Sequence, residues 1–464
     1  MQQLTPRETE LIAAETRHNL GHHSLYVELE KTKGAPELTF DALRALVDER
    51  LHLLPGFRRR LHRVPLHLDR PWWLEDPDFD LDYHIRHLAV PRSDGDDELH
   101  NLVGRLHERP LDRRRPLWEM YLIERYDGNP GLFIKVHHVL IDGVTGLDVL
   151  APLLADLTDL APAPKRRTDR VPDDTDLLIR AGWSIARSPW RMAELVFETT
   201  RRLPVVGRFN VLGSLAPWTS PKGAVELPGS DHQAPRTSFN RTLGTHRRVA
   251  FASIPMAEIK KIHHEHDVRF NDVVLALIAG TLRHWLVLHD ELPTEPIVAL
   301  TPLLVDSIDE PLGTALVPLA THRHDPIERL LEISASMAEL TDDIHARPVE
   351  AIQAVYHASP AVAALASRLI VRTGAFTRLM PPFNVYVVNV PGGPEQQFIN
   401  GYRLAHQYSL STLVDGTGLS VSAMSNGDSV DVGFVADREL VPDLSVLAER
   451  LGHELDILSG RVAA

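Results

Sequence analysis

The segment from residue 132 to residue 143 constrains the fold more than any other part of the chain. Its first five residues place Leu, Ile and Val at alternate positions, which predicts a β-strand with one buried face. HHVLIDG at 137–143 follows, and its Asp-Gly pair predicts a turn. Leucines then recur at helical spacing over 147–157. The order strand, turn, helix places His138 on the buried face of the strand end and His137 on the opposite face.

Two histidines beside a carboxylate predict acid–base chemistry. An unperturbed imidazole has a pKa of about 6.5, so His138 can accept a proton at neutral pH and return it later in a cycle. Asp142 can meet His138 across the turn, where it either orients the ring or braces the loop, and Gly143 serves the turn backbone. The alternative for His138 is a hydrogen-bonded core residue. For His137 we expect a structural role, with acid–base chemistry as the alternative, so the candidate catalytic residues are His138, His137, Asp142 and Gly143.

The composition predicts a soluble two-domain protein. A chain of 464 residues exceeds what one hydrophobic core usually holds, and no apolar run reaches the roughly 18 residues of a membrane span. The N-terminus carries acids and lacks the apolar region of a secretory signal, so we expect a cytoplasmic protein. The absence of cysteine excludes disulfides, thiolate metal sites and cysteine nucleophiles. The net charge of −14 disfavours nucleic-acid binding.

A basic, proline-rich segment divides the chain. Between residues 161 and 210, ten Lys/Arg stand against six Asp/Glu, and Trp183 and Trp190 lie among arginines. The predicted domains are therefore 1–160 and 237–464, joined by a linker at 161–236 that contains an amphipathic helix. This helix either packs across the two domains or lies in a lipid interface, with its arginines toward phosphates.

Strands and helices are mixed in both predicted domains. Besides the histidine strand, the first domain has an extended segment at 118–124. For the second domain the patterns predict strands at 247–254, 296–304, 384–390, 419–424 and 429–435, and helices at 256–266, after 271 and at 442–458.

Four motifs in order along the chain carry a family resemblance. HHVLIDG matches the HHxxxDG signature of acyl-CoA-dependent acyltransferases. PLWEMYLIE at 116–124, NDVVLA at 271–276 and NVPGG at 389–393 resemble the PLW, ND and NVPGP motifs of the bacterial wax ester synthase/diacylglycerol acyltransferase (WS/DGAT) family. The ordered set is much more specific than HHxxxDG alone.

The resemblance implies an α/β, two-domain fold of the chloramphenicol-acetyltransferase type, with mixed sheets and an interdomain tunnel. It implies long-chain acyl transfer from acyl-CoA to a lipid hydroxyl, that of diacylglycerol or of a fatty alcohol. His138 would be the general base, deprotonating the alcohol and then protonating the CoA thiolate. We expect no metal, no cofactor and no protein partner, and contact with a membrane or lipid-droplet surface. The chain has no cysteine and no GxSxG elbow, so direct transfer in a ternary complex is simpler than a covalent acyl-enzyme.

The motifs also imply substrate-binding residues, each with a structural alternative. The PLW residues can be plain core, the ND pair can cap a helix, and the NVPG residues can form a strand-ending turn. The HHEH cluster at 263–266 lacks the HExxH order of a zinc site, so we expect it to lie on a solvated helix face. The predicted substrate-binding residues are Pro116, Leu117, Trp118, Asn271, Asp272, Asn389, Val390, Pro391 and Gly392.

The second half departs from the family motifs at several positions. Leu304 and Asp306 stand where the family shows serine and arginine, and Gly393 replaces the last proline of NVPGP. Two other hypotheses therefore stay open. One is an HHxxxDG enzyme for another hydroxyl acceptor, such as a polyketide or glycolipid. The other is a non-catalytic protein that binds acyl-CoA or lipid.

Overall fold

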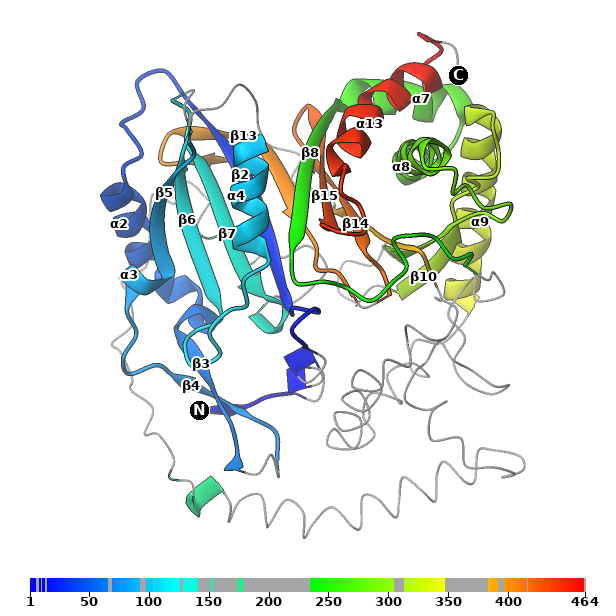
Figure 1. Cartoon of the computed structure of the whole chain (residues 1–464). Coiled ribbons are helices and arrows are strands. Elements are labelled where there is room, and N and C mark those ends of the chain that lie inside the picture. The colour runs from blue at the N-terminus through cyan, green and yellow to red at the C-terminus, as the bar shows by residue number, and fades with distance from the viewer. Residues whose placement is uncertain are drawn as a thin grey trace, which may run out of the picture.

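The structure, a computed structural model, describes three long parts of the chain. These are residues 1–140, 234–346 without 304–312, and 383–462. The structure also describes residues 152, 173 and 175–177. Within the three long parts it does not describe residues 6–7, 10, 13–14, 66–68, 92–96, 126–127, 391–395 and 415. The described residues form two six-stranded sheets and one small three-stranded sheet. Figure 1 shows the two large sheets side by side, each with helices against it.

The first large sheet has the strand order β12-β13-β2-β7-β6-β5. Its strands pair antiparallel except β5 and β6, which are parallel. Apolar residues of α2 cover one face, and those of α4 cover the other. The elements are β2 (His22–Lys31), α2 (Phe40–Arg50), α3 (Leu81–His84), β5 (Ile85–Ala89), α4 (Asp97–His107), β6 (Trp118–Glu124), β7 (Gly131–His137), β12 (Phe398–Ile399) and β13 (Tyr402–Leu410).

The small sheet has the order β1-β4-β3 and lies near the N-terminus. It packs through Leu61 and Trp73 into a cluster that also holds Leu117 and Val139. Two short 3-10 helices, η1 and η2, lead into β3, and a third, η4, follows β7. The elements are β1 (Gln2–Gln3), η1 (Leu51–Leu53), η2 (Pro55–Arg58), β3 (Arg59–His62), β4 (Trp72–Glu75) and η4 (His138–Leu140).

The second large sheet has the order β10-β9-β11-β14-β15-β8 and packs against a layer of helices. Helix α8 is long and apolar enough to cross a membrane, but 72% of its most apolar window is buried among the described residues, as in the core helix of a soluble protein. The elements are β8 (Arg247–Pro255), α7 (Met256–His266), α8 (Phe270–Leu288), β9 (Val298–Leu303), β10 (Gly313–Pro318), α9 (Pro326–Ala346), β11 (Val385–Val390), β14 (Leu419–Asn426), β15 (Ser429–Asp437) and α13 (Leu444–Leu458).

Strand β13 crosses from the second half of the chain into the first sheet. It pairs antiparallel with β2, from Tyr402 opposite Lys31 to Leu410 opposite Ser24. The predicted second domain, 237–464, is therefore not one self-contained unit, because its residues 398–410 complete the sheet of the first. Such a crossover cannot be read from local periodicity, since the paired strands lie more than 370 residues apart.

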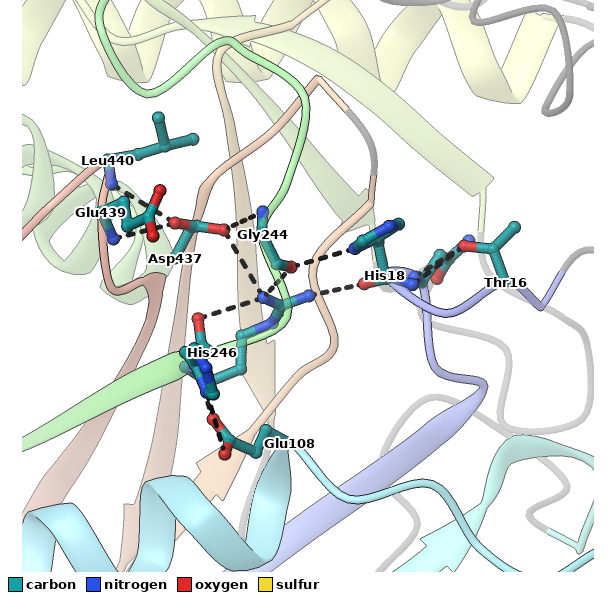
Figure 2. Close-up of polar contacts among 10 residues, drawn as sticks. Thr16, His18, Glu108, Gly244, His246, Asp437, Glu439 and Leu440 are labelled. Carbon is teal, nitrogen blue, oxygen red and sulfur yellow. Dashed lines mark hydrogen bonds and ion pairs between the residues drawn. The ribbon is translucent and has the colours of Figure 1, made fainter.

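The buried Arg247 joins both halves and the N-terminal segment. Figure 2 labels its partners His18, Glu108, Gly244 and Asp437. Arg247, at the start of β8, pairs with Asp437 at 3.5 Å. Its guanidinium donates to the carbonyls of Gly244 (2.8 Å) and His18 (2.6 Å), and its amide donates to Glu108 (2.8 Å) at the end of α4. Burying a cation requires such acceptors. This cluster therefore fixes residue 18 and α4 against the second sheet.

Most predicted elements are confirmed. The strand at 118–124 and the helix at 256–266 have the predicted bounds, and the apolar segment after Asn271 is the buried helix α8. The predicted helix at 147–157 and nearly all of the linker at 161–236, with Trp183 and Trp190, lie outside the described residues, as does the domain boundary at residue 160.

Candidate active site

His137 joins the end of β7 to the N-terminal segment. It is 2% exposed, and the amide of Val139 donates to its Nδ1 (3.1 Å), so this nitrogen carries no proton. The Nε2–H therefore donates to the carboxylate of Glu15. That carboxylate also accepts from the amide of Gly21 (3.0 Å) and pairs with Arg113. Burial, followed by the charge of Arg113, lowers the pKa of His137 to about 3, so the ring is neutral. This geometry fits a structural role.

His138 begins the turn η4 and does not extend the strand. Its amide donates to the carbonyl of Gly21 (2.9 Å), which anchors the backbone to the start of β2. The side chain is partly exposed, in contrast to that of His137. Its ring centroid lies 6.0 Å from that of His23, with an angle of 55° between the rings. The turn thus holds one imidazole in place while leaving it accessible.

His23 is a residue of this site that the motifs do not indicate. It lies on β2 opposite Val136 of β7, and its Nε2 is 3.1 Å from Oγ of Ser409 on β13. Burial lowers the pKa of His23 to about 4, so this ring is neutral as well. The only sequence signal is a second His-His pair, at 22–23, before an alternating segment. The pairing of β2 with β7 that brings His23 to His138 is not visible in the spacing.

The PLW residues lie at the start of β6, next to the histidine strand: Trp118 is the first residue of β6, and Pro116 and Leu117 directly precede it. All three are buried, and the carbonyl of Leu117 accepts from the amide of His137 (3.0 Å). Trp118 donates from Nε1 to the carbonyl of Phe57 (2.8 Å) and stacks on His84 at 4.5 Å. These contacts fit the core alternative, in which Pro116, Leu117 and Trp118 are buried residues that hold the end of β7 in place. Their contact with substrate stays a prediction.

The ND residues lie in the first turn of α8 and have different partners. Asp272 is fully buried and accepts from the amide of Arg269 (3.0 Å) and from Oγ of Ser334 on α9 (2.8 Å). Arg269 is the N-cap residue of α8, and Asp272 is the third residue of the helix, whose side chain accepts from the N-cap amide as in a capping box. Burial raises the pKa of Asp272. Asn271 is partly exposed and does not cap the helix.

Asn271 instead connects two of the motifs. Its Oδ1 accepts from Nδ2 of Asn389 on β11 at 2.8 Å. Val390, the last residue of β11, is buried and packs with Val136 and Met424 in the cluster that spans both sheets. The ND and NVPG motifs are therefore adjacent at the start of α8 and the end of β11. Asp142, Gly143, Pro391 and Gly392 lie outside the described residues, so their predicted roles stay predictions.

Within the described parts of the chain, no group of three or more His, Cys, Asp or Glu side chains could hold a metal ion. In the HHEH cluster, His264 and Glu265 are exposed on α7, as the sequence predicts. The arrangement at the histidine turn is one that can support acid–base chemistry. It contains one accessible imidazole beside a second, neutral one, on a backbone held by buried hydrogen bonds.

Comparison with known families agrees with this arrangement. Residues 4–274 match the model of the wax ester synthase/diacylglycerol acyltransferase catalytic domain, and residues 311–459 match that of the WS/DGAT C-terminal domain. These ranges contain three of the four motifs whole, the first four residues of NDVVLA, and most of the chain. The chain belongs to the WS/DGAT family.

Curated relatives agree over the full length of the chain. A Mycobacterium tuberculosis protein named "putative diacylglycerol O-acyltransferase" is 33% identical over 479 residues, covering 99% of this chain and all of that protein. Another from the same organism, named "probable diacylglycerol O-acyltransferase", is 31% identical over 481 residues and covers both chains fully.

Solved structures confirm the two-domain α/β fold. The wax ester synthase/diacylglycerol acyltransferase of Marinobacter aquaeolei VT8 superposes with a TM-score of 0.71 at 26% identity, covering 99% of this WS/DGAT chain and all of that one. The first condensation domain of the CDA synthetase has a TM-score of 0.55 at 16% identity, with 100% and 97% covered. At that identity the likeness shows the fold alone.

Proposed function

We propose that this WS/DGAT protein transfers a long-chain acyl group from acyl-CoA to the hydroxyl of a lipid, with His138 as general base. Family membership supports the reaction class. The assignment to His138 rests on the exposure of its ring. His138 is partly exposed on a turn whose backbone is hydrogen-bonded to Gly21, whereas the adjacent His137 is fully buried. Of the HHVLIDG histidines, only His138 is accessible to a reactant.

In the proposed reaction one proton moves from the acceptor hydroxyl to His138 and then to the CoA thiolate. His138, neutral at the start, accepts the proton of the acceptor hydroxyl as its oxygen attacks the thioester carbonyl. The carbon–sulfur bond then breaks, and the imidazolium returns the proton to the departing CoA thiolate. A positioned general base of this kind contributes about 10²–10⁴-fold to the rate. The remaining acceleration comes from holding both substrates together, and no covalent acyl-enzyme is needed.

His23 fits beside His138 as a residue that positions the hydroxyl. The ring centroids are 6.0 Å apart, a spacing at which one oxygen atom can be within hydrogen-bond distance of a nitrogen of each ring. Ser409 holds one nitrogen of His23, and the low pKa keeps the ring uncharged, so it does not oppose formation of a positive charge on His138. We therefore assign the proton to His138 and the orientation of the acceptor to both histidines.

The names of the relatives support the proposed acceptor class. Diacylglycerol is the acceptor named for the mycobacterial proteins, and the Marinobacter protein is named for wax esters as well. We propose diacylglycerol and long-chain alcohols for this chain. A cytoplasmic location at a membrane or lipid-droplet surface is part of the proposal, because both products are oily. The predicted tunnel, and the absence of any cofactor, stay predictions.

The test is product formation by the purified protein. Labelled palmitoyl-CoA is incubated with diacylglycerol or hexadecanol, and the lipids are separated after the reaction. We expect triacylglycerol, wax ester or both, with equimolar CoA thiol. Thiol release with neither acceptor, nor with a polyketide or glycolipid alcohol, despite tight acyl-CoA binding would contradict the proposal and favour a lipid-binding protein. Product with a polyketide or glycolipid alcohol alone would retain acyl transfer but reject the proposed acceptors.

A further inference from the structure

A basic cavity lies in the second half of the molecule, among helices α8, α9 and α13. It has a volume of about 230 Å³. Its charged lining consists of three arginines and one glutamate, Arg283, Arg329, Arg450 and Glu454. The rest of the lining consists of two histidines, three apolar side chains and a glycine, which are His284, His324, Val287, Pro326, Ile457 and Gly280. An excess of two positive charges is notable in a chain whose net charge is −14.

The one carboxylate of the cavity is already shared. Glu454 is buried, and its Oε1 accepts from Nε of Arg450 (2.7 Å) while its Oε2 accepts from Arg329 (3.3 Å). Arg283 donates to the carbonyl of Thr321 (2.6 Å) and has no carboxylate partner of its own among the described hydrogen bonds and ion pairs. A backbone carbonyl carries no full charge, so this contact does not neutralise the guanidinium.

The buried arginine of the cavity is not fully satisfied. Arg329 is 4% exposed, and its Nε has no hydrogen-bond partner among the described residues. Burial lowers the pKa of Arg329 and of Arg283, because both guanidiniums have lost part of their hydration. Asp325, the residue before α9, accepts hydrogen bonds from the amides of Ile327 and Glu328 and so caps that helix. An anion entering the cavity would restore the missing interactions.

We propose that this cavity is a binding site for a phosphate group. Guanidiniums recognise phosphate through paired, charge-assisted hydrogen bonds, and here α8, α9 and α13 each contribute one arginine to the cavity. Each of these helices also contributes an apolar residue, Val287, Pro326 and Ile457, which fits the organic part of a phosphate ester. Val287 (49% exposed) and Leu288 (57%) extend the apolar surface at the end of α8, as expected beside a phospholipid headgroup. The ligand is either a soluble phosphate ester or such a headgroup.

None of the residues that line the cavity belongs to the histidine turn or to the strands β2, β7 and β13 beside it, and the cavity also lies away from the ND motif. Arg283 lies twelve residues after Asn271 on α8, which at 1.5 Å per residue is about 18 Å along the helix. The proposal therefore does not depend on the acyl-transfer reaction and goes beyond it. Loss of catalysis in the purified protein would leave it unaffected.

Two substitutions with opposite expected effects test the site. Titration calorimetry with inorganic phosphate on the full chain should show binding, and Arg450→Gln should weaken it by about tenfold, since one charge-assisted contact is lost. Glu454→Gln removes the competing carboxylate and should tighten binding by a similar factor. A residue of purely structural importance would not give changes of opposite sign. Arg461→Gln, which alters an arginine paired with Glu258 and Asp456 outside the cavity, should leave binding unchanged.

Vesicle flotation identifies the source of the phosphate. Vesicles of phosphatidylcholine alone are compared with vesicles that also contain phosphatidic acid. Binding to the second kind that Arg450→Gln abolishes supports the site and assigns a headgroup; phosphate binding without flotation supports it and assigns a soluble ester. Absence of phosphate binding, or equal affinity in the wild type and Arg450→Gln, overturns the proposal. Because Arg450 is partly exposed, its replacement should leave the fold intact, which a thermal melt checks.

Discussion

At the residue scale, two adjacent histidines have different environments because the strand ends between them. His137 points to Glu15 and is fully buried, whereas His138 lies on the turn and is partly exposed. The motif HHVLIDG indicates acid–base chemistry but does not by itself distinguish the two rings. The distinction comes from contacts with residues 15 and 21, which lie more than 110 positions away.

Replacing His23 tests its proposed role in orienting the acceptor. His23→Phe keeps a ring beside His138 but removes both nitrogens, so the KM for the acceptor should rise or kcat should fall, by about 5–30-fold in kcat/KM. The KM for acyl-CoA should not change. Steady-state kinetics with each substrate varied measures this, and His264→Phe on the exposed face of α7 is the control. Wild-type kinetics in His23→Phe would rule the role out.

Gly21 has no space for a side chain, and its replacement tests the brace around His137. A Cβ there would lie 2.3 Å from Oε1 of Glu15 and 2.9 Å from Nε2 of His137. Gly21→Ala should displace Glu15, lower the free energy of unfolding by about 1–3 kcal/mol and reduce kcat. Gly452→Ala is the matched control, because nothing lies within 4 Å of its Cβ on the exposed side of α13 and alanine favours helix. Equal thermal midpoints for both variants would contradict the account.

At the element scale, the sequence predicts the elements with strong periodicity and misses those defined by distant pairing. Strand β6 and helix α7 follow from alternation and from helical spacing, and the apolar run after Asn271 predicts a buried helix. Strands β2 and β13 were not predicted, since they have mixed polar and apolar residues and exist through their pairing with each other. The candidate site can therefore be predicted only in part: the sequence indicates β7 and the two histidines at its end, but not His23 and Ser409.

The hydrogen bond between Asn271 and Asn389 connects α8 to β11 and predicts coupling between the two motifs. Asn271→Ala and Asn389→Ala should each reduce kcat/KM, because each frees the end of β11 next to residue 391. The double variant should be little worse than either single variant, as expected when one interaction is removed. A double-mutant cycle in kcat/KM measures this. Independent, additive losses would show that the bond does not link the motifs.

At the scale of the whole molecule, the two halves fold as partners. Strand β13 completes the first sheet, and Arg247 joins residue 18, α4 and the second sheet. The first sheet and the helices beside it also carry several neutral histidines, of which His84, His107 and His137 are buried. Burial lowers the pKa of His23 and His84 to about 4 and that of His107 and His137 to about 3.

These histidines predict a loss of stability in mild acid. The folded pKa values lie below the unfolded value of about 6.5, so between these values the unfolded chain binds more protons and the free energy of unfolding falls as pH falls. The loss should begin near pH 6.5 and continue to about pH 4 or 3. Each histidine contributes up to about 1.4 kcal/mol per pH unit in that window.

Thermal midpoints at pH 7 and pH 5 measure this effect. The wild type should melt at a clearly lower temperature at pH 5. His107→Gln can keep a hydrogen bond to Ser24 without titrating, so it should lose less on acidification, whereas exposed His264→Gln should behave as the wild type. An identical shift in His107→Gln and the wild type would mean that buried histidines do not cause the loss.

The most direct test of the proposed reaction is the rate of CoA thiol release by the wild type and by His138→Ala, with saturating palmitoyl-CoA and the better acceptor. Removal of the base should lower kcat by about 10²–10⁴-fold while acyl-CoA binding and the thermal midpoint change little. Retention of full turnover in His138→Ala would contradict the assignment of the base.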